Sequence, residues 1–138
     1  MVDRFFVKRK VKLIQEDLGQ LEKFEEREVA DYLKKSAAER LLEKIIMRAI
    51  DINQHLIAEL GKGNESIRGY EDTFYAIAEF GVYAMDFAKE IAPSAGLRNR
   101  LVHEYNDTKE EIIYESIPQA ISQYTLYCDY ILKFLAKN

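Results

Sequence analysis

The sequence has 138 residues, 48% of them hydrophobic and 32% charged, a composition that is typical of a single globular domain over residues 1–138 and excludes a disordered chain. There is no apolar run of the ~20 residues that span a membrane, no secretion signal, and only one cysteine, Cys128, so we expect a cytoplasmic protein. The net charge of −4 excludes bulk attraction to nucleic acid, which could bind only through a local basic cleft.

The N-terminal segment has the pattern of an amphipathic helix, because apolar residues recur at steps of three and four. This stripe consists of Val7, Val11, Ile14, Leu18, Leu21 and Phe24. The polar residues off the stripe are interpreted as a solvated face: Lys10, Lys12, Gln15, Glu16 and Asp17.

A second helix is predicted after the charged segment 25–35. Ser36 and Glu39 form a capping box that would open it, and the glycines at 61 and 63 would end it. Its apolar stripe is too wide for a single neighbour, so we expect two or more: Leu41, Leu42, Ile45, Ile46, Ala49, Ile50, Ile52, Leu56, Ile57 and Leu60.

Asp51 and His55 share a face of this second helix at a spacing of four residues. Such a pair could act in catalysis or bind a ligand, but an ordinary structural or surface role is the preferred interpretation. Cysteine and further histidine are missing from their vicinity, so the sequence predicts no metal site.

The segment 70–91 is apolar on almost every side, which is typical of a helix buried in a bundle or at an interface. Gly81 is expected to break or bend it. A short connection over 92–96 would then lead into a short helix near residues 94–105 with the sequence Arg-Asn-Arg-Leu-Val-His-Glu-Tyr from Arg98 to Tyr105.

The last predicted helix opens with a second capping box, Thr108 to Glu111, and should kink or restart near Ile117, because Pro118 removes one backbone hydrogen bond. Its stripe consists of Ile112, Ile113, Ile117, Ile121, Tyr124, Cys128, Ile131, Leu132 and Leu135. Tyr124, Tyr127 and Tyr130 are interpreted as core or dimer packing, with base stacking as the alternative. Cys128 is predicted to be a buried, inert thiol.

No segment shows the alternation of apolar and polar residues that is typical of a strand. The sequence therefore predicts an all-α fold, an up-and-down bundle with short connections.

The segment from Arg98 to Tyr105 carries the chemistry. Arg98 is a permanent cation and His103 can exchange a proton near neutral pH. This pair suits the cleavage of a phosphodiester without metal: the imidazole would move a proton at the ribose 2′-hydroxyl or the leaving oxygen, and the guanidinium would stabilise the transition state. One histidine cannot easily do both proton transfers, so a second copy across a dimer, or another residue, is needed.

Arg98, His103 and Tyr105 match the R-x4-H-x-Y motif of the HEPN-domain ribonuclease toxins of the HepT type, which this chain therefore resembles. The context agrees: Ala95-Gly96-Leu97 precedes the motif, Asp107 follows it, and Glu39-Arg40-Leu41-Leu42 and Ile50-Asp51-Ile52-Asn53 lie on a long second helix. The resemblance covers roughly Val7 to Leu135.

The resemblance implies a bundle of about five helices that forms a homodimer, with the motifs of two protomers lining one cleft. It implies a toxin of a toxin–antitoxin pair that cleaves RNA without metal or cofactor, with Arg98 and His103 as catalytic residues and Asn99 as their support. Tyr105 corresponds to the tyrosine to which a cognate minimal nucleotidyltransferase of the MNT type adds AMP, silencing the toxin.

Two other interpretations remain at this point. Members of this family have also been described as substrate-binding subunits of nucleotidyltransferases, so the chain could be a non-catalytic module that presents a substrate or nucleotide; its net acidic charge favours this. Alternatively, it is a helical dimerisation domain, and the polar strip is only a helix end.

Overall fold

The computed structural model describes residues 1–24, 32–61, 67–97, 99–100 and 107–138. The described residues form α-helices and 3₁₀-helices and contain no strand, which confirms the all-α prediction. The elements in chain order are α1 (Arg4–Leu21), η1 (Glu22–Phe24), α2 (Tyr32–Leu60), α3 (Tyr70–Glu79), α4 (Met85–Ile91), η2 (Ala92–Gly96) and α6 (Asp107–Lys137).

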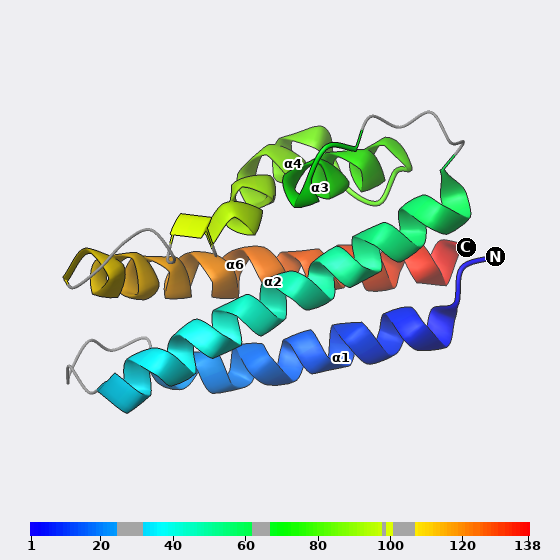
Figure 1. The fold of residues 1–138 in the computed structure, drawn as a ribbon. Helices are drawn as coiled ribbons and strands as arrows, with labels where there is room; N and C mark the ends of the chain where they lie inside the picture. Colours follow the sequence, from blue (N-terminus) through cyan, green and yellow to red (C-terminus); the bar gives the residue numbers. More distant parts are fainter. Residues whose placement is uncertain (25–31, 62–66, 98, 101–106) are drawn as a thin grey trace.

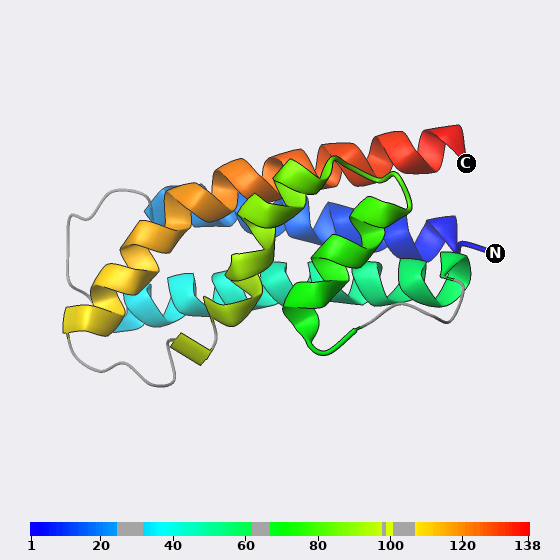
Figure 2. The same cartoon turned by 90° about the horizontal axis from the view of Figure 1, so that it is seen from above.

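The three longest helices run lengthwise through the molecule, and α1 is antiparallel to both α2 and α6 (Figure 1). The shorter α3 and α4 lie across them, as the view from above shows (Figure 2). None of the described helices is both long enough and apolar enough to cross a membrane.

The predicted starts of the second and last helices were wrong in detail. The first helix, for which no start was predicted, has Asp3 as its N-cap, and the Asp3 carboxylate accepts a hydrogen bond from the backbone N–H of Phe6 at 3.0 Å. Helix α2 begins at Tyr32, which places Ser36 inside it, and α6 begins at Asp107, one residue before Thr108. Neither Ser36 nor Thr108 is therefore the N-cap residue of its helix.

The apolar segment 70–91 is broken where the sequence indicated. Gly81 has a backbone φ of 88°, a left-handed conformation that glycine adopts at little cost, and the chain turns there between α3 and α4. By contrast, α6 does not restart at Pro118 but continues to Lys137. Figure 2 shows this helix bending in its N-terminal half, as expected when proline removes one backbone hydrogen bond.

Helix α2 is the centre of the core, because it packs against α1, α3 and α6. This confirms that its wide stripe has several neighbours. The side chains of Leu42, Ile45, Ile50, Ile52 and Leu56 are all completely buried.

A chain of buried hydrogen bonds joins α6, α2 and α3. The Tyr127 hydroxyl donates to the Asn53 side-chain oxygen at 2.6 Å and lies 3.1 Å from the Ala49 carbonyl. The Asn53 amide donates to the Thr73 hydroxyl at 3.0 Å, which in turn donates to the Tyr70 carbonyl at 2.6 Å. Each polar group therefore has a partner inside the core.

Removing one hydroxyl from this network should destabilise the fold. We expect Tyr127→Phe to lower the free energy of unfolding by about 1–3 kcal/mol, because the Asn53 oxygen loses its donor while it remains buried. Tyr70→Phe, which removes an exposed hydroxyl, is the matched control and should change stability by less than about 0.5 kcal/mol. Urea unfolding of the two variants measures this, and equal losses would contradict the buried network.

Candidate functional site

The structure describes only part of the motif. Arg98, His103 and Tyr105 lie outside the described residues, as do Leu101 and Val102, which lie between them in the sequence. Asn99 and Arg100 are helical and exposed. The arrangement of Arg98, His103 and Tyr105 relative to one another therefore remains a prediction, whereas the surroundings of Asn99 can be described.

The chain that leads into the motif is fixed to α6 and α4. The Ser94 hydroxyl donates to the Ile91 carbonyl at 2.6 Å, and its oxygen lies 2.6 Å from the Tyr124 hydroxyl. Because a serine has one hydrogen to donate, Tyr124 is the donor to Ser94. Leu97 is buried directly before the motif. These contacts set the position from which the motif begins.

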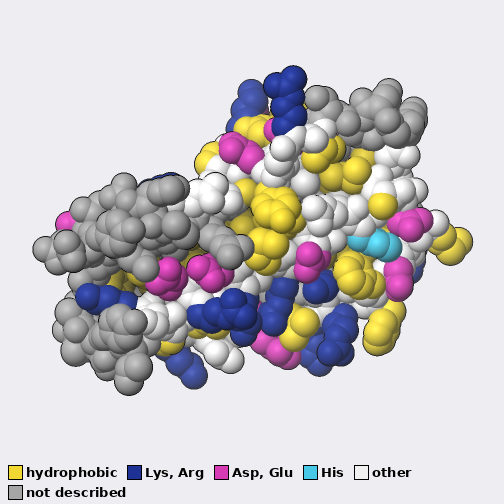
Figure 3. Space-filling view, in the orientation of Figure 1, with side chains coloured by type: hydrophobic (Ala, Val, Ile, Leu, Met, Phe, Trp, Pro, Cys, Tyr) yellow, Lys and Arg dark blue, Asp and Glu magenta, His cyan; other side chains and the backbone are white. Residues whose placement is uncertain are grey.

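Asn99 lies at the edge of a groove of about 690 Å³ between α1, α2 and the start of α3. Among the described residues, four cationic side chains line it: Lys10, Arg40, Lys44 and Arg48. Two carboxylates, Glu43 and Asp51, also line it, so the lining carries a net positive charge on a chain whose total charge is −4. Figure 3 shows Lys and Arg side chains gathered over α1 and α2 on this face.

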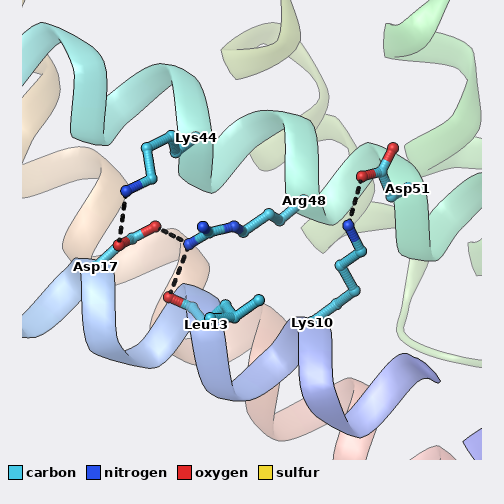
Figure 4. A network of polar contacts seen from close by, with 6 residues as sticks. All are labelled: Lys10, Leu13, Asp17, Lys44, Arg48 and Asp51. Carbon is cyan, nitrogen blue, oxygen red and sulfur yellow. Dashed lines mark hydrogen bonds and ion pairs between the residues drawn. The ribbon is translucent and has the colours of Figure 1, made fainter. Parts of the chain in front are cut away.

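Four of the residues that line the groove, Lys10, Lys44, Arg48 and Asp51, take part in ion pairs between α1 and α2 (Figure 4). The Asp17 carboxylate accepts from the Arg48 guanidinium and lies 3.6 Å from the Lys44 ammonium nitrogen. Arg48 also donates to the Leu13 carbonyl at 3.2 Å. Along the same seam, the Lys10 nitrogen lies 3.0 Å from the Asp51 carboxylate.

The prediction of a solvated face on α1 was therefore wrong for Asp17, which is only 5% exposed. Lys12, Gln15 and Glu16 are exposed, as predicted. Asp17 and Lys10 are seven residues apart and so share the face that turns toward α2. The polar character of this face hid its contact with the neighbouring helix.

The histidine outside the motif, His55, has a structural role. The ring nitrogen Nε2 of His55 accepts a hydrogen bond from the backbone N–H of Asp3 at 2.9 Å, and the ring packs on Phe6 with the centroids 5.1 Å apart. Asp51, which the sequence placed on the same face, is paired with Lys10 instead. The preferred interpretation of His55 is thus confirmed: it helps to hold the start of α1 against α2.

The tyrosines of the last helix belong to the core. Tyr124 and Tyr127 are completely buried, with ring contacts to Phe74, and half-buried Tyr130 packs against Phe87. This confirms the packing interpretation. Cys128 is buried as predicted, and burial raises the pKa of its thiol to about 12, so the unreactive protonated form persists at neutral pH.

Comparison with known proteins assigns the family. The family model described as "Ribonuclease HepT-like" matches residues 9–131. The chain belongs to this HepT-like family. A curated relative, "tRNA nuclease HepT" of Aphanizomenon flos-aquae (strain 2012/KM1/D3), is 37% identical over 97% of this chain and 92% of its own length. The resemblance drawn from the motif is confirmed.

Two solved structures share the fold of this HepT-like chain. A chain in a crystal structure of a toxin–antitoxin with AMP-PNP superimposes with a TM-score of 0.78 at 15% identity, covering 94% of this chain and 99% of the other. A chain in a crystal structure of a mutant of the toxin–antitoxin MntA-HpeT superimposes with a TM-score of 0.67 at 21% identity. The match covers 93% of this chain and 92% of the other.

The two carboxylates at the α1–α2 seam should differ in their contributions to stability. Asp17→Ala leaves Arg48 partly buried without its carboxylate, and we expect it to lower the free energy of unfolding by about 3 kcal/mol. Asp51→Ala breaks an ion pair whose carboxylate side chain is 40% exposed, which should cost at most about 1 kcal/mol. Urea unfolding at low and high salt tests both; equal losses would refute the buried role of Asp17.

Proposed function

We propose that this protein is a toxin ribonuclease that cleaves RNA without a metal ion or other cofactor. The observation that carries the proposal is the complete motif of Arg98, His103 and Tyr105 in a chain that is 37% identical, over nearly its whole length, to a tRNA nuclease. The net positive lining of the groove beside Asn99 supports it, since a chain of net charge −4 needs a local basic surface to bind RNA. We place its action in the cytoplasm, consistent with its single buried thiol.

In this mechanism His103 removes the proton of a ribose 2′-hydroxyl, and the oxygen attacks the adjacent phosphorus. The bond from phosphorus to the 5′-oxygen breaks, and that oxygen takes up a proton. Arg98 stabilises the extra negative charge on the phosphoryl oxygens, and Asn99 supports the two. Since one imidazole starts as the base, His103 of a second copy would supply the proton, so the active form is a homodimer.

Cleavage should survive EDTA and depend on the motif. We expect Arg98→Ala and His103→Ala each to lower the rate of RNA cleavage about 100-fold or more, because each removes a group that acts in the transition state. His55→Ala is the matched control, since it removes the only other histidine and should leave the rate within about threefold of wild type.

The substrate provides a second control. RNA methylated on every 2′-oxygen should resist the wild-type protein, because the attacking hydroxyl is missing. Cleavage of this RNA, or full activity of both motif variants, would overturn the mechanism. A protein that cleaves no RNA yet binds a nucleotidyltransferase would instead favour the non-catalytic, nucleotide-presenting subunit.

We further propose that a nucleotidyltransferase of the MNT type adds AMP to Tyr105 and so silences the nuclease. On an ideal helix, residues seven apart share a face, so AMP on Tyr105 would place a phosphate beside Arg98, where the scissile phosphate has to bind.

Tyr105→Phe should therefore cleave RNA within about threefold of wild type but escape silencing by the partner and ATP, because the acceptor hydroxyl is gone. Tyr70→Phe, which removes another exposed tyrosine hydroxyl, should still be silenced. Intact mass and residual RNase activity after incubation measure the outcome. Silencing of Tyr105→Phe with the mass increase of AMP would show that another residue is the acceptor.

A further inference from the structure

Tyr70 is an exposed aromatic residue that lines the basic groove. It is 48% exposed, lines the groove together with Asn99, and its ring makes no aromatic contact with the described residues. Tyr124 and Tyr127 of the last helix, in contrast, are buried in the core. A ring with a free face can stack on a nucleobase of any kind.

The backbone under this ring is held in place. The Tyr70 carbonyl accepts from the Thr73 hydroxyl, which belongs to the buried network with Asn53 and Tyr127. Asn53 and Thr73 are almost completely buried. The position of the exposed ring is thus connected to the core of the bundle, and little backbone ordering is required when a base binds.

The cations of the groove divide into two kinds. Lys44 and Arg48 are committed to buried Asp17. Arg40 is 72% exposed and lies 3.8 Å from Glu43, and half-buried Lys10 is paired with Asp51, whose side chain is 40% exposed. Neither Glu43 nor Asp51 is completely buried, so Arg40 and Lys10 can exchange these carboxylates for a phosphate without leaving a completely buried charge unpaired.

We propose that this groove binds a single-stranded segment of the RNA substrate beside the motif. Its phosphates lie along Lys10 and Arg40, and one base stacks on Tyr70. Asn99, the motif residue that follows Arg98 in the sequence, lines the groove, so a strand held here would lie beside this part of the motif. This inference rests on the proposed function for the identity of the ligand, and it adds binding residues that lie outside the motif.

Binding is measured on His103→Ala protein, which should not consume the RNA, by fluorescence anisotropy with a labelled single strand of about 16 nucleotides. Adding Tyr70→Ala should weaken binding about tenfold, whereas Tyr70→Phe should match the parent, because the ring and not the hydroxyl stacks. The same sequence as a duplex should bind more weakly, since its bases are already stacked.

The phosphate contacts are tested by salt dependence. Lys10→Gln and Arg40→Gln together should lower the slope of log affinity against log salt by about 1.4, or about 0.7 for each contact with single-stranded RNA. Lys133→Gln, an exposed cation on α6 away from the groove lining, should leave the slope unchanged. The midpoint of thermal unfolding of each variant should lie within about 4 °C of the parent, since the broken ion pairs are partly exposed.

Unchanged affinity and slope in these variants would overturn the proposal. If they keep RNA affinity but lose a nucleotidyltransferase partner, the groove is a protein interface and the proposal is wrong. Failure of the proposed function gives a different result. In that case the wild-type protein does not cleave RNA, while the affinities of the variants still show whether the groove binds RNA.

Discussion

The fold depends on one constraint, which is that α2 has apolar side chains over more of its circumference than a single neighbour can cover. Three helices, α1, α3 and α6, must pack around it before these side chains leave water. Arg40, Lys44, Arg48 and Asp51 follow one another on α2 at intervals of three and four residues and line the groove, and the last three form ion pairs with side chains of α1. The same packing that builds the core therefore fixes where the polar groove can be.

Two polar networks make this packing specific. On one side of α2, Asp17 binds Arg48 and Lys44, which sets the register of α1 against α2. On the other side, Asn53 connects Tyr127 of α6 to Thr73 of α3. Hydrophobic contact alone would tolerate a shift of one helix along another, whereas a buried carboxylate or amide loses its partners when the helices slide.

The distribution of charge connects the fold to the proposed chemistry. A net charge of −4 keeps the whole molecule from attracting RNA, yet the described charged side chains that line the groove next to Asn99 are four cations and two carboxylates. Binding would then be confined to the neighbourhood of the motif, because phosphate contacts weaken with distance on the scale of the screening length, about 8 Å at physiological salt. An acidic chain with a groove whose described lining is net positive is thus compatible with a nuclease as well as with a binding subunit.

The sequence by itself determined the helical class, the break at Gly81, the buried tyrosines and the family, because periodicity, glycine conformation and a spaced motif are local properties. It missed the start of α2 at Tyr32 and the burial of Asp17. Capping patterns such as Ser36 to Glu39 also occur inside helices, and the partners of Asp17 lie 27 and 31 residues further along the chain. Only the tertiary structure decided which polar faces meet. Residues on different helices converge through packing, which the spacing along one helix does not encode. For this reason the structure alone brought together at one groove Lys10, Arg40, Tyr70 and Asn99.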